Sequence, residues 1–159
     1  MKISIRKGFG FGLTSGIITT LGLMIGLAYG TSSKAVVLGS ILLIAIADAL
    51  SDALGMHISE EAGSKQTTEK QVWESTYSTV FFKFLFALTF AVPVLLFNLN
   101  LAVIVSVVWG LLLLTIFSYN IAKNRKERPL RAIFEHVFIA AIVIIATYFI
   151  GKWIATWAI

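Results

Sequence analysis

Two aspartates, Asp48 and Asp52, lie inside a long apolar stretch and are the residues most able to do chemistry. Their spacing of four residues stacks both carboxylates on one face of a helix. A carboxylate in the middle of a membrane span costs roughly 2.5–3.5 kcal/mol on insertion scales. Because stacked carboxylates repel each other, we expect either a proton on one of them or a cation between them. The pair therefore predicts a cation site that could also accept protons.

Further donors lie near this pair. Met56 follows Asp52 by one turn on the same helix face, and oxygen ligands with a thioether suit Fe²⁺ or Mn²⁺. Ser15 and Thr19, from the first apolar stretch, could line the same polar interior. We therefore predict Asp48, Asp52 and Met56 as metal ligands in a cavity lined by Ser15 and Thr19. The alternative is that the aspartates bond to neighbouring helices and that Met56 fills space in a packed interior.

The polar residues after the second apolar stretch form a weaker cluster. His57, Glu60 and Glu61 have the spacing of a helical metal pair, and they lie directly below Asp52. We predict that they form a cytosolic vestibule, although a solvated helix end would have the same composition. Lys83 lies about two turns into the third apolar stretch, and we expect it to extend to the inner membrane interface. A pair with Glu135 is the alternative for this lysine.

Composition defines the elements that must position these residues. The 159-residue chain is 58% hydrophobic and 13% charged, whereas soluble domains are roughly 45–50% apolar and about 25% charged. Such a chain is an integral membrane protein, because a domain this small could not bury so much apolar surface. We predict one all-α domain of residues 1–159 with a short cytosolic segment over 58–76. Its five spans are 8–29, 35–57, 77–97, 101–121 and 132–158.

The basic residues predict the orientation. Eleven of the thirteen Lys and Arg residues fall on one side of these spans, and only Lys34 and Lys152 fall on the other. The positive-inside rule then places the N-terminus in the cytosol and the C-terminus outside. We expect no nucleic-acid partner, because the net charge of +5 is explained by this asymmetry. The absence of cysteine excludes disulfides, thiolate metal sites and cysteine nucleophiles.

The first stretch also contains two series of small residues at four-residue spacing, which are typical of closely packed membrane helices. Gly8, Gly12 and Gly16 form the first series. The second series consists of Gly22, Gly26 and Gly30. We predict that both series mark helix contacts. In the third span, Pro93 predicts a kink.

Three segments resemble the vacuolar iron transporter (VIT) family. Residues 14–26 read TSGIITTLGLMIG, where the family's first helix typically reads NDGLVTTLGLVxG. Residues 47–59 read ADALSDALGMHIS, where the second helix of the family has AGAxSMAxGEYxS. Residues 147–151, TYFIG, are similar to its last helix. The chain differs from the family pattern at the site itself. Ser15 stands where the family has Asp, and Asp52 stands where it has Met.

The resemblance implies a divergent, short member that lacks the family's cytosolic metal-binding domain. It implies a homodimer that exports cytosolic Fe²⁺ or Mn²⁺ against protons, with its transport site between the first two helices. No prosthetic group is expected. The short chain without a targeting extension leads us to expect the cytoplasmic membrane of a prokaryote.

Two other classes of function compete with transport. A non-transporting membrane scaffold or regulator on the same fold is favoured by the loss of the first-helix Asp. A metal-dependent membrane enzyme is disfavoured, because the motifs of phosphatidyltransferases and intramembrane aspartyl proteases are missing. We therefore expect a protein that is not an enzyme.

Overall fold

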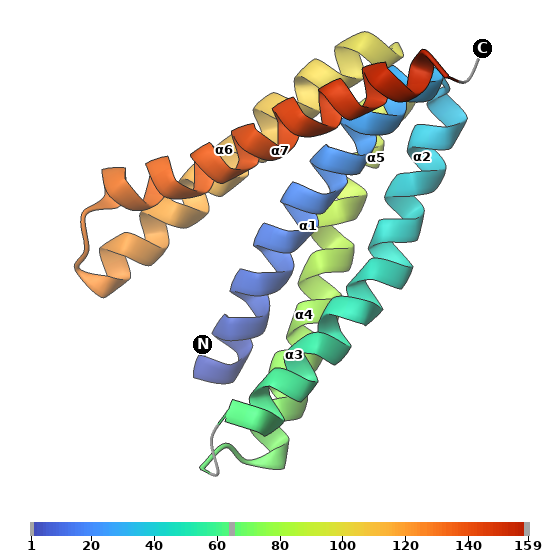
Figure 1. Cartoon of the computed structure of the whole chain (residues 1–159). Helices are drawn as coiled ribbons and strands as arrows, with labels where there is room; N and C mark the ends of the chain where they lie inside the picture. The colour runs from blue at the N-terminus through green and yellow to red at the C-terminus, as the bar shows by residue number, and fades with distance from the viewer. Residues whose placement is uncertain (1, 64–65, 158–159) are drawn as a thin grey trace. The chain divides into compact units, whose positions relative to one another are not determined.

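The computed structural model describes residues 2–63 and 66–157, and these residues form helices and short turns without any strand. Five of the helical segments in this described part are long and apolar enough to cross a membrane (Figure 1). The all-helical, five-span class predicted from the sequence is therefore confirmed. In order, the spans are α1 (Ile3–Thr31); α2 (Lys34–Leu43), η1 (Ile44–Asp48) and α3 (Ala49–Gly63); α4 (Glu69–Thr89) and α5 (Ala91–Leu96); α6 (Leu99–Arg125); and α7 (Pro129–Ala155).

The helices extend beyond most of the predicted spans, because helical hydrogen bonding continues into polar residues. Helix α4 begins after Thr68, whose hydroxyl accepts from the Gln71 backbone N–H while the Gln71 side chain accepts from the Thr68 N–H. This reciprocal capping starts the helix well before the apolar residues do. The predicted segment 58–76 is consequently mostly helical. Lys65, and Ala158 at the end of the predicted fifth span, lie outside the described residues.

Proline interrupts the third span as expected. The break falls at Phe90, between α4 and α5, and Pro93 lies inside α5. Proline has no N–H to bond the carbonyl four residues earlier, and its ring also collides with that carbonyl. The carbonyl concerned belongs to Thr89, the last residue of α4.

The chain divides into two compact units. The first comprises Met1–Thr20 and Gly39–Ala91, and the second comprises Leu21–Leu38 and Val92–Ile159. Helices α1 and α2 therefore each contribute residues to both units.

In the first unit, the glycines of the first series bring α1 against α4. A Cβ atom on Gly12 would lie 2.7 Å from the Thr79 carbonyl oxygen, and one on Gly16 would lie 3.2 Å from the Lys83 carbonyl oxygen. Beside them, the rings of Phe9 and Phe82 meet edge to face with centroids 4.6 Å apart. The small residues thus permit close approach of the two backbones, as the sequence predicts.

In the second unit, the second series of glycines brings α1 against α7. A Cβ atom on Gly22 would lie 2.9 Å from the Val143 side chain, and Gly30 faces Gly151. Tyr29 and Tyr148 add an edge-to-face ring contact at 4.6 Å.

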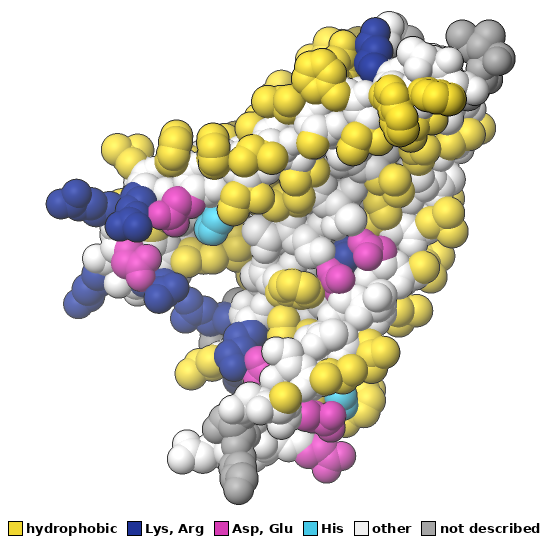
Figure 2. Space-filling view, in the orientation of Figure 1, with side chains coloured by type: hydrophobic (Ala, Val, Ile, Leu, Met, Phe, Trp, Pro, Cys, Tyr) yellow, Lys and Arg dark blue, Asp and Glu magenta, His cyan; other side chains and the backbone are white. Residues whose placement is uncertain are grey.

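Large apolar side chains cover much of the outer surface, as Figure 2 shows. On α7, for example, Phe134, Phe138, Ile142 and Phe149 are all exposed. Such a surface is stable in a hydrocarbon environment and would be unstable in water. The protein is therefore an integral, multi-pass membrane protein.

We expect Gly12→Ala to lower the free energy of unfolding by about 1–3 kcal/mol, because the added methyl group meets the backbone of α4 and cannot be accommodated by moving a side chain. The check is thermal unfolding of the purified protein in mild detergent.

Gly39→Ala is the matched control, because a Cβ atom at Gly39 has nothing within 4 Å. This variant should be as stable as the parent or up to about 1 kcal/mol more stable, since alanine favours the helix. Equal unfolding midpoints for the two variants would contradict the proposed packing of α1 on α4.

Candidate functional site

A turn of π-helix, η1, leads into the aspartate pair. It comprises Ile44–Asp48, so Asp48 is its last residue and α3 begins at the next position. Ile44 and Ala45 are buried against Ala87 and Leu88 of the third span. Single π-turns within α-helices are rare and occur frequently at functional sites.

The ammonium group of Lys83 lies between the two aspartates. Its Nζ atom is 2.5 Å from Asp48 Oδ2 and 2.5 Å from Asp52 Oδ2. Ser15 joins the cluster, because its hydroxyl donates to Asp52 Oδ2 at 2.5 Å and accepts from Lys83 Nζ at 3.0 Å. The three spans of the first unit, through α1, η1 with α3, and α4, thus meet at one charged cluster: Ser15, Asp48, Asp52 and Lys83.

Burial differs sharply within this charged cluster. The Lys83 side chain is fully buried, whereas the side chains of Asp48 and Asp52 are 34% and 22% exposed. In the orientation of Figure 2, acidic side chains are visible beside a basic one, away from the charged helix ends. With both carboxylates ionised and Lys83 protonated, the cluster has a net charge of −1. It is therefore an acidic site that already contains one cation.

The expected position of Lys83 at the membrane interface is wrong. Its side chain turns inward because two carboxylates at hydrogen-bond distance compensate the ammonium better than a long extension along the helix could. The alternative partner, Glu135, is instead bonded to Arg131 at 2.8 Å. The sequence did contain a signal: a stacked carboxylate pair calls for a cation, and Lys83 is a lysine deep within another apolar stretch.

The two aspartates contact Lys83 with different geometry. Its Oδ2 atom is buried, and among the described residues it has no partner that meets hydrogen-bond geometry, despite the close ion pair with Lys83. Asp52, by contrast, accepts aligned hydrogen bonds from both Ser15 and Lys83. Asp48 Oδ2 is therefore held by a close but less directional ion pair, whereas Asp52 is also fixed by aligned hydrogen bonds.

The remaining predicted site residues lie around this cluster with partners of their own. Thr19 is exposed, and its hydroxyl oxygen lies 3.4 Å from that of Ser15. Met56 is half-buried one turn beyond Asp52. His57 Nδ1 lies 3.0 Å from the Thr76 hydroxyl, which itself donates to the Val72 carbonyl.

The two glutamates of the predicted vestibule also lie beside nitrogen-bearing side chains. Glu60 accepts from Lys7 at 2.9 Å, and Glu61 lies 3.4 Å from His57 Nε2. Within residues 2–63 and 66–157, no three His, Cys, Asp or Glu side chains come together in a way that could hold a metal ion. Whether the predicted ligands bind a metal stays a prediction.

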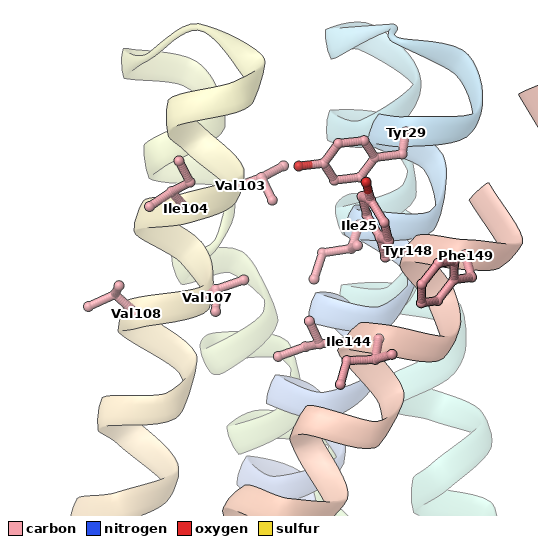
Figure 3. Close-up of a pocket in the computed structure, with 10 residues that line it drawn as sticks. Ile25, Tyr29, Val103, Ile104, Val107, Val108, Ile144, Tyr148 and Phe149 are labelled. Atoms are coloured by element: carbon pink, nitrogen blue, oxygen red, sulfur yellow. The ribbon is translucent and has the colours of Figure 1, made fainter. Parts of the chain in front are cut away.

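The second unit contains a pocket of different chemistry. Its volume is about 480 Å³, and Figure 3 shows apolar side chains of α1, α6 and α7 around it, with the rings of Tyr29 and Tyr148 close together. The only side-chain polar atoms among its lining residues are the two tyrosine hydroxyls. It offers no carboxylate or imidazole to a cation, so the charged cluster is the better candidate site.

Comparison with known proteins identifies the family. The sequence model of the VIT family matches residues 52–152, more than half of the chain, and this match includes Asp52, Met56 and Lys83. Ser15 and Asp48 precede the matched segment. A search of curated proteins finds no match. The VIT family consists of membrane proteins that transport metal ions, which points to transport rather than catalysis. The chain belongs to the VIT family.

Proposed function

We propose that this VIT-family protein exports Fe²⁺ or Mn²⁺ from the cytosol in exchange for protons, and that Asp48 and Asp52 bind the ion. The observation that carries the proposal is a partly exposed carboxylate pair within a membrane span. Ionisable groups in such spans are costly and usually mark an ion pathway. Both carboxylates can be reached by an incoming cation, since the side chains of Asp48 and Asp52 are 34% and 22% exposed.

The neighbouring donors support a borderline divalent cation. Carboxylate and hydroxyl oxygens suit Mn²⁺, and the thioether of Met56 extends the set towards Fe²⁺. Ser15 already bonds to Asp52, and Thr19 lies beside Ser15. In this proposal Met56 is the softer ligand, and the two hydroxyl residues line the cavity.

The protein is proposed to act as a homodimer. In the described part of one chain, the acids and imidazoles do not gather in the number that a metal site needs. A second copy would supply another Asp48 and Asp52, which would make an oxygen-rich site of four carboxylates. This argument supports a shared site, as the family resemblance implies.

The proposed orientation rests on the distribution of charge, and the proposed direction of transport rests on the family resemblance. Apart from Lys83, which is buried inside its span, ten of the thirteen basic residues fall on the side that the positive-inside rule assigns to the cytosol. His57, Glu60 and Glu61 then form the cytosolic approach to the aspartates, and the ion leaves towards the opposite side. The membrane is proposed to be the cytoplasmic membrane of a prokaryote.

One observation favours a second candidate, a membrane scaffold or regulator that transports nothing. Lys83 already compensates the two carboxylates, so the cluster is stable without a metal ion. In this second candidate, the ion pairs hold the three helices together and bind no metal ion.

We expect the double variant Asp48→Asn with Asp52→Asn to lower Mn²⁺ uptake into proteoliposomes by about tenfold or more, since even second-shell partners of metal ligands contribute 10–100-fold. Glu127→Gln with Glu135→Gln is the matched control. It also removes two carboxylates, but from exposed ion pairs of the second unit, and it should transport like the parent.

Asparagines beside a buried lysine could destabilise the fold for reasons unrelated to transport. The triple variant that adds Lys83→Met is free of this charge imbalance and should also be inactive. Transport at the parental rate by either aspartate variant would exclude Asp48 and Asp52 as ligands. No uptake by the parent would favour the scaffold.

Proton exchange is tested with an imposed pH gradient and a panel of Fe²⁺, Mn²⁺ and other divalent cations. Metal entering the vesicle should drive protons out, so an acidic lumen should accelerate uptake and metal entry should make the lumen more alkaline. An uptake rate that is independent of the pH gradient, with no change in luminal pH, would contradict the coupling of metal transport to protons. Faster uptake of a cation other than Fe²⁺ or Mn²⁺ would contradict the proposed substrate.

A further inference from the structure

The ammonium of Lys83 occupies the position where a bound cation would be expected. It lies 2.5 Å from an oxygen of each aspartate and contacts the Ser15 hydroxyl as well. These are the oxygens that the proposed metal ion would need. The lysine is therefore in direct competition with any cation that binds between Asp48 and Asp52.

We propose that Lys83 is a tethered competitor that sets the affinity of the site for divalent metal, displaced when the ion binds and returning when it leaves. This inference rests on the proposed function. It assigns to a residue of the third span a role in metal affinity that neither the aspartate pair nor the family match implies.

Packing confines the stem of the lysine and leaves its tip as the part able to move. A Cβ atom on Gly16 would lie 3.4 Å from Lys83 Cγ and 3.4 Å from its Cα, so α1 lies directly against the start of this side chain. The tip, by contrast, contacts three polar groups, and two of them belong to partly exposed aspartates. In this proposal the ammonium leaves the carboxylates by rotation of the outer bonds of the side chain, towards the partly exposed side of the aspartates, while the backbone stays in place.

Electrostatics make the competition exclusive. A divalent ion bound to the same two oxygens would lie within a few ångströms of the ammonium, in one chain or in the proposed dimer alike. Like charges a few ångströms apart repel strongly where the surroundings are apolar. The metal binds tightly only when the ammonium has moved away, and the returning ammonium in turn weakens the hold on the metal.

The decisive comparison is between Lys83→Met and Lys83→Arg in the full-length protein in lipid nanodiscs, with Mn²⁺ binding followed by electron paramagnetic resonance. Methionine has a similar length and no charge, so Lys83→Met should bind Mn²⁺ at least about tenfold more tightly than the parent. Arginine holds carboxylates through a planar, permanently charged fork, so Lys83→Arg should bind Mn²⁺ at least about tenfold more weakly.

Transport kinetics separate competition from a purely structural role. In proteoliposomes, Lys83→Met should show a lower KM for Mn²⁺ together with a lower maximal rate, because the ion is no longer expelled. A lysine that only held the helices together would lower the maximal rate without tightening binding. Lys152→Met is the matched control: it removes a lysine from α7 in the second unit, and its KM and rate should equal those of the parent.

Lys83→Met leaves two carboxylates without their cation, so it should unfold at a lower temperature than the parent and recover on addition of Mn²⁺. If it does not fold at all, Lys83→Arg decides, since that variant keeps the charge. Parental Mn²⁺ affinity in the methionine variant, or in the arginine variant when it alone folds, overturns the proposal.

The failure of this proposal and the failure of metal transport are distinguishable. A parent that transports Mn²⁺ while its Lys83 variants keep the parental affinity retains the proposed function and refutes the competition. A parent that binds no metal while Lys83→Met does supports the competition and refutes transport by the parent. The absence of binding in every variant refutes both.

Discussion

The ion pairs of Lys83 with Asp48 and Asp52 are the interaction on which the first unit depends. A lone lysine or a lone aspartate in an apolar environment is expensive, and each becomes tolerable only beside its partner. Because the three charges come from two different spans, they fix which faces of those spans meet. Ser15 extends the same requirement to α1, since its hydroxyl bonds to both charges. One charged cluster therefore specifies the packing of three helices.

The glycines provide the second constraint on helix packing. Because they have no side chain, neighbouring helices can come into close contact with α1. The first series on α1 lets that helix approach α4 closely enough for Ser15 to reach the charges, and Gly16 lies against Lys83 itself. The second series performs a similar role against α7. Packing in the apolar environment thus relies on close backbone contact, because the burial of apolar surface offers little advantage in lipid. The charged cluster therefore depends on the small residues, because they let α1 approach α4.

Much of this could be predicted from the sequence. The five spans follow from the length of the apolar stretches, and the stacking of Asp48 on Asp52 follows from helical periodicity. The position of Lys83 does not, because it depends on how two spans pack and these residues are 31 and 35 positions apart. The helix ends also extend past the prediction, since capping by Thr68 and Gln71 is independent of apolarity. Local patterns specify faces, and only tertiary packing decides which faces meet.

The π-turn at Ile44–Asp48 has a further consequence for how the second span must be understood. Each residue of an α-helix contributes about 100° of rotation and each residue of a π-turn contributes less, so this turn shifts the angular phase of every residue that follows it. The apolar face of α2 and the acidic face of α3 therefore belong to one uninterrupted helical span, but they do not lie on the same side of it. Shortening this turn by a single residue would rotate both carboxylates away from Lys83 while leaving the composition and hydropathy of the span almost unchanged. The chemistry of the site depends on helical phase, a property that composition does not record.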